Sequence, residues 1–344
     1  MKYKPKPPYH TGDARRVLER AIADRVFPGS AVEVGSMDGI LWQDTLGTLT
    51  FEPNAPAVKP ETKYDLASLT KVLATTTMVM GLIEKDLLHL DTLVAQCFVE
   101  WRGEDREMVT IRDLLEHTSG LSARLVDPPP EGRREFEHEI CTMKLEYPPR
   151  TRSIYSDLGF ILLGFVISDR ASLPFAQLHD MFTVDKSVAA PTMPEADDVR
   201  RGRMLVGEVH DNYACALGGA AGHAGLFGTA REVGAMARVW LKAANGYSFL
   251  PFPFTRWDFG RRFIEKSTVP GSSRALGWDT MLTTSSCGTE MSPRAFGHVG
   301  YTGTSLWIDP YRDRYFVLLT NRACGGGTTD QMRDVRRAFH DALS

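Results

Sequence analysis

Apolar residues recur along this chain with helical spacing in some segments and with strand-like patterns in others. Residues 11–27 open with a Thr/Asp cap and continue with apolar residues three or four apart, which predicts an amphipathic helix. Residues 30–50 hold two β-rich runs around Met-Asp-Gly, a pattern typical of a hairpin. Residues 157–171 and 328–344 predict two more helices, the first apolar and the second amphipathic.

The middle of the chain alternates helical patterns with proline-rich and glycine-rich segments. Residues 110–121 predict a short helix that ends at Gly120. The prolines of residues 122–151 disfavour helix, so we expect irregular structure there. A glycine-rich run, residues 216–230, leads into a predicted helix over residues 231–245.

The order of these patterns predicts an α/β (α+β) fold with one sheet built from both ends of the chain. Residues 304–322 predict a strand, a proline-containing turn and a fully apolar strand. We expect residues 1–85 and 265–344 to form the sheet region and residues 86–264 to form an all-α region inserted between them. The functional site is expected at their junction, so that the two regions act as one functional unit.

The composition narrows the possible partners and the compartment. The chain has 43% hydrophobic and 24% charged residues, as an ordinary globular protein does, and a net charge of −3 gives no support for nucleic acid or a membrane surface as a partner. Five dispersed cysteines without a CxxC pair predict reduced thiols. The N-terminus shows no secretory signal, so we expect the cytoplasm, and the periplasm only if the native start is missing.

One apolar segment carries a charge that needs an explanation. Between Leu66 and Ile83 the only charged residue is Lys71, three positions after Ser68. The segment approaches the length of a membrane span, but Ser68, Lys71 and four threonines favour a buried helix. Residues three apart on a helix share a face, so the amine can reach the hydroxyl. A lysine accepts a proton only when it is neutral: either burial lowers its pKa, or a polar network must carry the proton instead.

Two further segments hold groups that serve a nucleophilic serine. Tyr155-Ser156-Asp157 lies between a proline-rich loop and a helix, and a tyrosine beside an ammonium can relay protons. The structural alternative is a core tyrosine with Asp157 as a helix N-cap. In His298-Val-Gly-Tyr-Thr-Gly, the glycines allow close approach of a ligand, and a backbone N–H can stabilise an oxyanion. The alternative there is a glycine-bearing edge strand with a surface histidine.

Together, and in this order, these segments resemble the serine β-lactamase and penicillin-binding-protein superfamily. The likeness is closest to class C β-lactamases, D,D-peptidases and β-lactamase-like (family VIII) esterases. Ser-Leu-Thr-Lys matches the family's S-x-x-K, Tyr-Ser-Asp its Y-x-N, and His-Val-Gly its K-T-G, and residues 114–121 and 216–230 also look like the family. The resemblance spans roughly residues 15–340 and implies a β-lactamase-like fold, with an antiparallel sheet flanked by helices.

The resemblance also implies roles for individual residues. Ser68 is the nucleophile, Lys71 accepts or relays its proton, and Tyr155 is the general base and later the acid. His298 stands where the family's lysine binds substrate and supports the tyrosine. The backbone N–H groups of Ser68 and Tyr301 form the oxyanion hole. The residues expected beside the substrate are Asp157, Gly300, Thr302 and His223, the last with loop structure as its alternative; His117 is expected to be structural.

Three departures from the family pattern bear on the substrate. Asp157 replaces an asparagine and cannot donate as an amide does. His298 replaces a lysine, and Val299 replaces a threonine, so a charge and a hydroxyl that hold a substrate carboxylate are missing. These departures favour a small ester or amide as substrate, with β-lactamase or D-alanyl-D-alanine carboxypeptidase activity as the alternative. They also leave open a non-catalytic binding or sensor relative.

Other chemistries lack their motifs. The sequence has no G-x-S-x-G elbow, no H-E-x-x-H and no Cys/His zinc spacing. It also has no phosphate loop and no dinucleotide fingerprint. We therefore expect no metal and no cofactor, and we expect only a small-molecule ester, amide or β-lactam-type substrate as partner. The sequence leaves the oligomeric state open.

Overall fold

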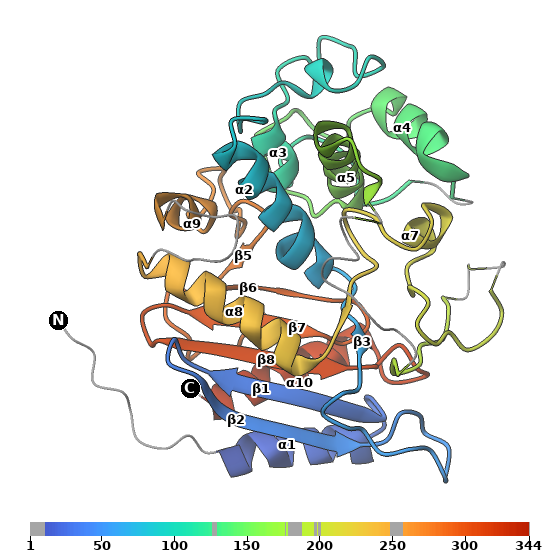
Figure 1. Ribbon diagram of the computed structural model, residues 1–344, viewed down its shortest axis with the longest axis vertical. Helices are drawn as coiled ribbons and strands as arrows, with labels where there is room; N and C mark the ends of the chain where they lie inside the picture. The colour runs from blue at the N-terminus through green and yellow to red at the C-terminus, as the bar shows by residue number, and fades with distance from the viewer. Residues whose placement is uncertain are drawn as a thin grey trace.

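One antiparallel sheet made from both ends of the chain organises the molecule (Figure 1). The computed structural model describes residues 11–125, 129–175, 177, 188–195, 198, 201–247 and 257–343. Its six-stranded sheet has the order β2-β1-β8-β7-β6-β5. The strands are β1 (Gly29–Gly35), β2 (Ile40–Gly47), β5 (Asp279–Thr280), β6 (Phe296–Val299), β7 (Ser305–Asp309) and β8 (Arg314–Thr320). The predicted fold is confirmed, because β1 from the first part of the chain pairs with β8 from the last part.

Helices cover both faces of this sheet, and the alternation of side chains explains how. Ala31 and Val317 pack with α8 (Ala230–Ala244), which crosses one face in Figure 1. Val32 and Leu318 point to the other face and pack with α1 (Thr11–Ala23) and α10 (Thr329–Ala342). Both faces of the central strands are therefore buried, which accounts for their near-continuous apolar sequence.

The remaining helices gather at one end of the sheet, the upper part of Figure 1. A π-helical segment, Lys71–Thr75, continues into α2 (Thr76–Glu84). The other elements of this end are a 3₁₀ turn (Val94–Gln96), α3 (Ile111–Leu115), α4 (Gly132–Thr142), α5 (Asp157–Ala171), α7 (Asn212–Ala216) and α9 (Trp257–Phe263). A two-stranded sheet of β3 (Tyr64–Asp65) and β4 (Phe227–Gly228) lies next to the start of the π-helical segment.

Two sequence predictions on local structure were wrong. Helix α4 lies inside residues 122–151, which were predicted to be irregular; the prolines flank the helix, and Phe136 and Ile140 bury one face of it. Helix α3 ends with Glu116 as its C-cap, not at Gly120, which instead approaches the carbonyl of Tyr147 closely. Residues 126–128 of the irregular range lie outside the described residues, as do residues 1–10, on which the expectation about a secretory signal rests.

The division at residues 86 and 264 stays a prediction. Helix α8 falls inside the predicted all-α range but packs against the sheet. One continuous apolar core contains side chains of both regions, among them Phe160 of α5 and Val317 of β8. Among the described residues, no helix has the length and apolar character that crossing a membrane requires.

Candidate active site

Ser68 lies in a sharp turn between β3 and the helix that contains Lys71. Ala67, immediately before it, has a left-handed backbone with φ of +47°. The Asp65 side chain holds this turn, because its Oδ1 accepts a hydrogen bond of 2.8 Å from the Ala67 N–H. The chain thus reverses just before the serine, which is half-buried at the start of the helix.

Lys71 is fully buried and its ammonium has three oxygen partners. Nζ donates to Ser68 Oγ at 3.0 Å, to Asp157 Oδ1 at 2.7 Å and to the carbonyl of His223 at 3.3 Å. Burial alone would lower the pKa of Lys71, but the Asp157 carboxylate and Tyr155 outweigh it and hold the pKa above its ordinary value. Lys71 is therefore charged at neutral pH. Of the two routes that the sequence left open, this geometry favours a polar network over a neutral lysine.

Tyr155 precedes α5 and faces the same ammonium. Lys71 Nζ lies 4.7 Å from the centroid of its ring, and the Arg274 guanidinium lies 5.1 Å from it. Burial raises the pKa of the Tyr155 phenol above its ordinary value, although the Lys71 ammonium opposes this. The N-cap of α5 is Ser156, whose hydroxyl accepts from the Gly159 N–H, so the prediction of Asp157 as a possible N-cap was wrong.

His298 on β6 is buried and neutral. Its Nδ1 lies 2.8 Å from the Val299 carbonyl, which can only accept, so Nδ1 carries the hydrogen. Burial lowers the pKa of His298 well below its ordinary value, and Arg274 and Lys71 add to this. No charge thus stands where the family's lysine would be. Its ring centroid lies 5.8 Å from that of Tyr155.

His117 has the structural role that the sequence indicated. It is buried, and its Nδ1 accepts a hydrogen bond of 3.0 Å from the Ser156 N–H. Its ring lies 4.7 Å from the Tyr155 ring and 5.2 Å from the Phe160 ring, measured between centroids. His117 therefore fixes the start of α5, and with it the place of Tyr155.

The turn after β6 is tied to the turn that carries Ser68. A Cβ on Gly300 would lie 2.6 Å from the Leu66 carbonyl, so only glycine fits this approach. Thr302 Oγ1 donates to the Asp65 carbonyl at 2.7 Å, and Thr304 Oγ1 donates to the Leu66 carbonyl at 3.0 Å. Within the described residues, the backbone N–H groups of Ser68 and Tyr301 have no protein acceptor. Such free donors are what an oxyanion hole requires.

These groups meet at a pocket of about 500 Å³. Ser68, Tyr155, His298, Gly300 and Tyr301 all line it. Thr302 and His223 do not line it: each is 1% exposed, and each contacts neighbouring protein groups, so their place beside a substrate stays a prediction. Asp157 does not line the pocket either, and its two carboxylate oxygens form ion pairs with Lys71 and Arg124.

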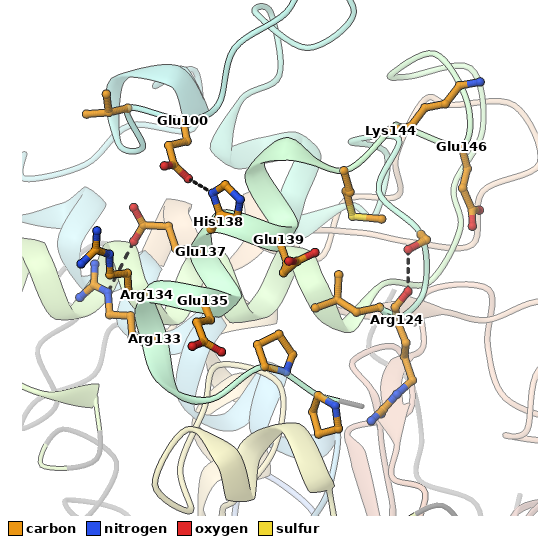
Figure 2. A pocket seen from close by; sticks show the side chains of 16 residues that line it. Glu100, Arg124, Arg133, Arg134, Glu135, Glu137, His138, Glu139, Lys144 and Glu146 are labelled. Carbon is orange, nitrogen blue, oxygen red and sulfur yellow. Dashed lines mark hydrogen bonds and ion pairs between the residues drawn. The ribbon is translucent and has the colours of Figure 1, made fainter. Parts of the chain in front are cut away.

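A larger hollow, about 1570 Å³, lies beside α4 (Figure 2). It contains none of the predicted catalytic residues. Arg124 lies on its rim, and Figure 2 shows this side chain extending away from the acidic side chains of α4. The Arg124 guanidinium contacts Asp157 and Asp211 instead.

Several residues at the site were not predicted from the sequence. Arg124 and Arg274 lie in segments with no motif, and Asp65 and Asp211 lie near the ends of short elements. Their contacts join segments that are 33 to 145 residues apart in sequence. No local pattern in the sequence marks these contacts, because each of them joins segments that are distant in the chain.

Comparisons with known proteins identify the family to which the chain is similar. The sequence model of the Beta-lactamase family matches residues 14–340. A putative D-alanyl-D-alanine carboxypeptidase of Salmonella gallinarum is 29% identical over 303 residues, covering 76% of this chain and 69% of that protein. The corresponding protein of Salmonella agona is 28% identical over the same shares of the two chains.

Solved structures with the same fold have lower sequence identity. EstCE1, a hydrolase with promiscuous acyltransferase activity, superposes with a TM-score of 0.74 at 19% identity, covering 96% of this chain and 98% of that one. A class C beta lactamase from Rhodobacter sphaeroides gives a TM-score of 0.73 at 18% identity, with the same coverage. At these identities the likeness establishes the fold alone.

Proposed function

The chain belongs to the beta-lactamase family and is a serine hydrolase, and we propose that it hydrolyses a small ester or amide through an acyl-enzyme on Ser68. One observation carries the proposal. The Lys71 ammonium lies 3.0 Å from Ser68 Oγ, and Ser68 lines a pocket together with Tyr155 and two backbone N–H groups without acceptors. A nucleophile, a proton acceptor and an oxyanion site are the three parts that acyl transfer needs.

In the proposed reaction, Tyr155 transfers a proton from Ser68 to the leaving group. Its phenolate oxygen takes the proton of Ser68 as Oγ attacks the carbonyl carbon and Tyr155 becomes a neutral phenol, because Lys71 already carries its full complement of protons. The Ser68 and Tyr301 N–H groups stabilise the oxyanion. Tyr155 then gives the proton to the leaving group, and the carbonyl–leaving-group bond breaks. Water hydrolyses the acyl-enzyme by the same steps, with Tyr155 again as base.

Replacing the nucleophile tests this directly. Ser68→Ala is expected to lower turnover of p-nitrophenyl acetate by about a thousandfold or more and to abolish labelling by a fluorophosphonate probe. Ser273→Ala is the matched control, since Ser273 lines the same pocket and is expected to keep both activities. Intact mass after reaction locates the adduct. Unchanged turnover in Ser68→Ala would contradict the proposal; binding without any covalent adduct would favour a non-catalytic relative.

A second substrate class, a carboxylate-bearing β-lactam or D-alanyl-D-alanine peptide, has one observation in its favour. Arg274 lines the pocket and is half-buried, and no described residue offers its guanidinium a hydrogen-bond acceptor. This cation is available to a substrate carboxylate even though His298 is neutral and Val299 has no hydroxyl. The curated relatives named as carboxypeptidases point the same way.

Side-by-side turnover separates the two substrate classes. We expect p-nitrophenyl acetate to react faster than a chromogenic cephalosporin, because Asp157 offers no amide donor to an acyl-amide carbonyl. Strong cephalosporin hydrolysis with a slow ester rate would reverse this preference.

We also propose a reducing compartment such as the cytoplasm. The five cysteines support this, because all of them are described and all are free thiols.

A further inference from the structure

A closed ring of polar contacts surrounds the Lys71 ammonium on the side away from the pocket. Lys71 contacts Asp157 Oδ1 at 2.7 Å, and Arg124 contacts Asp157 Oδ2 at 3.2 Å. Arg124 contacts Asp211 Oδ2 at 2.9 Å, and His223 Nε2 contacts Asp211 Oδ1 at 2.8 Å. The His223 carbonyl accepts from Lys71 at 3.3 Å and closes the ring.

The ring joins five separate segments, so the fold as a whole holds it. Lys71 starts the π-helical segment, Asp157 starts α5, Asp211 is the N-cap of α7, and His223 lies in the glycine-rich loop. Arg124 comes from the loop after α3 and also contacts the Asn212 amide oxygen at 2.5 Å. Its side chain is 35% exposed, whereas the other four range from 0% to 17%.

The ring alternates basic and acidic side chains. Lys71 and Arg124 contact Asp157, and Arg124 and His223 contact Asp211. Burial would raise the pKa of Asp211, but His223 and Arg124 outweigh it and hold the pKa well below its ordinary value. Burial would likewise lower the pKa of Arg124, but Asp211 and Asp157 hold it above its ordinary value. Lys71 and Arg124 thus each face a carboxylate, and His223 Nε2 contacts the remaining oxygen of Asp211.

The same residues do not make a metal site. Ligand atoms of Asp157, Asp211 and His223 lie within 4.8 Å of one another, as metal ligands do. Both carboxylates, however, already contact a protein cation, so a metal ion would have to displace Lys71 or Arg124. The cations of the protein itself take the place of a bound ion.

We propose that Arg124 is a positioning residue of the reaction: it holds the second oxygen of Asp157, fixes that carboxylate on Lys71, and so keeps Lys71 an ammonium and leaves Tyr155 as the only base. Asp211 anchors Arg124 in this role. This inference rests on the proposed function, since it concerns the base that activates Ser68. It also explains how the site tolerates a carboxylate at residue 157, where the family has a neutral amide.

Tyr155 faces Lys71 and Asp157 of the ring, the Arg274 guanidinium 5.1 Å from its ring centroid, and the rings of His298 and His117, whose pKa values burial lowers. Two substitutions in the ring change the charge near Tyr155 in opposite directions. Arg124→Met removes the positive charge beside Asp157 Oδ2, so less of the negative charge of that carboxylate is compensated. Because a nearby negative charge disfavours the Tyr155 phenolate, the acidic limb of the pH profile of kcat/KM moves to higher pH. Asp157→Asn removes the negative charge, so the same limb moves to lower pH. We expect each shift to reach about half a pH unit or more.

The experiment measures kcat/KM for p-nitrophenyl acetate against pH in Arg124→Met, Arg124→Lys and Asp157→Asn. Arg124→Lys is expected to restore much of the wild-type profile, since it keeps the charge. Arg134→Met, at an exposed arginine of α4 outside the ring, is the matched control and should leave the profile unchanged. A purely structural role for Arg124 would lower activity without moving the limb.

The outcomes separate this inference from the proposed function. If Ser68→Ala abolishes turnover but Arg124→Met and Asp157→Asn leave the limb in place, or shift it in the same direction, only the ring's role is overturned. If Ser68→Ala keeps full turnover, the proposed function itself fails. Thermal unfolding checks that each variant is folded; should Arg124→Met not fold, the nearly isosteric Asp157→Asn decides by the direction of its shift.

Discussion

Tyr155 is the residue at which burial and charge oppose each other most directly. Burial favours the neutral phenol, and the Lys71 ammonium 4.7 Å from the ring centroid favours the phenolate. The net effect is a pKa above the ordinary value of a tyrosine. A base with a high pKa is mostly protonated at neutral pH and gains its active form as the pH rises.

The pH dependence of the ester reaction follows from this sign. Below the pKa of Tyr155 the phenolate fraction increases about tenfold per pH unit, so kcat/KM for p-nitrophenyl acetate is expected to rise steadily from pH 6 to pH 9. Tyr155→Phe keeps the ring but removes the oxygen, and is expected to lower kcat by about a hundredfold or more. A profile that is flat from pH 6 to pH 9 in the wild type would argue against Tyr155 as the base.

At the scale of single elements, the spacing of apolar residues predicted helices and hairpins that form within one segment. It did not predict contacts between segments that are distant in the sequence. Helix α5 occupies the predicted residues 157–171, and the β1–β2 hairpin forms around Met-Asp-Gly. Helix α4 was missed because proline content was weighed above the buried stripe of Phe136 and Ile140. Arg124 was missed because its partners lie 33 and 87 residues away, and no local pattern records such a contact.

Gly222 shows how closely two such elements approach. A Cβ at this position would lie 1.9 Å from the Phe160 carbonyl of α5 and 2.9 Å from the Gly164 N. The Gly222 carbonyl also accepts from Thr75 Oγ1 at 2.6 Å, so the loop is held between two helices. The next residue, His223, supplies the carbonyl that Lys71 contacts.

Gly222→Ala is therefore expected to lower the free energy of unfolding by about 1–3 kcal/mol, because the methyl group meets backbone that cannot move away cheaply. Urea denaturation measures this. Gly202→Ala is the matched control: a Cβ there meets no heavy atom within 4 Å, and the expected change is within about 0.5 kcal/mol. Equal stability of the two variants would show that α5 and the glycine-rich loop separate easily.

At the scale of the whole molecule, the groups proposed for catalysis come from both of the predicted regions. Ser68 and Lys71 follow β3, Tyr155 precedes α5, and His298 lies on β6 of the sheet. The apolar core is continuous across the same boundary, since Leu114 of α3 and Leu306 of β7 belong to one cluster. The site is therefore complete only when both regions are folded against each other.

We accordingly expect urea to unfold the two regions together and to abolish ester hydrolysis in the same step. The tryptophans report on different regions: Trp101 is buried beside the helices, and Trp307 lies on β7. In Trp101→Phe and in Trp307→Phe, the midpoints of fluorescence, far-UV circular dichroism and activity should agree within each variant to about 0.3 M urea. Each variant keeps five of the six tryptophans, so the difference between its fluorescence transition and that of the wild type isolates the signal of Trp101 or of Trp307. A region that unfolds by itself would give these two signals different midpoints. Two resolved midpoints would show that the shared core does not couple the regions.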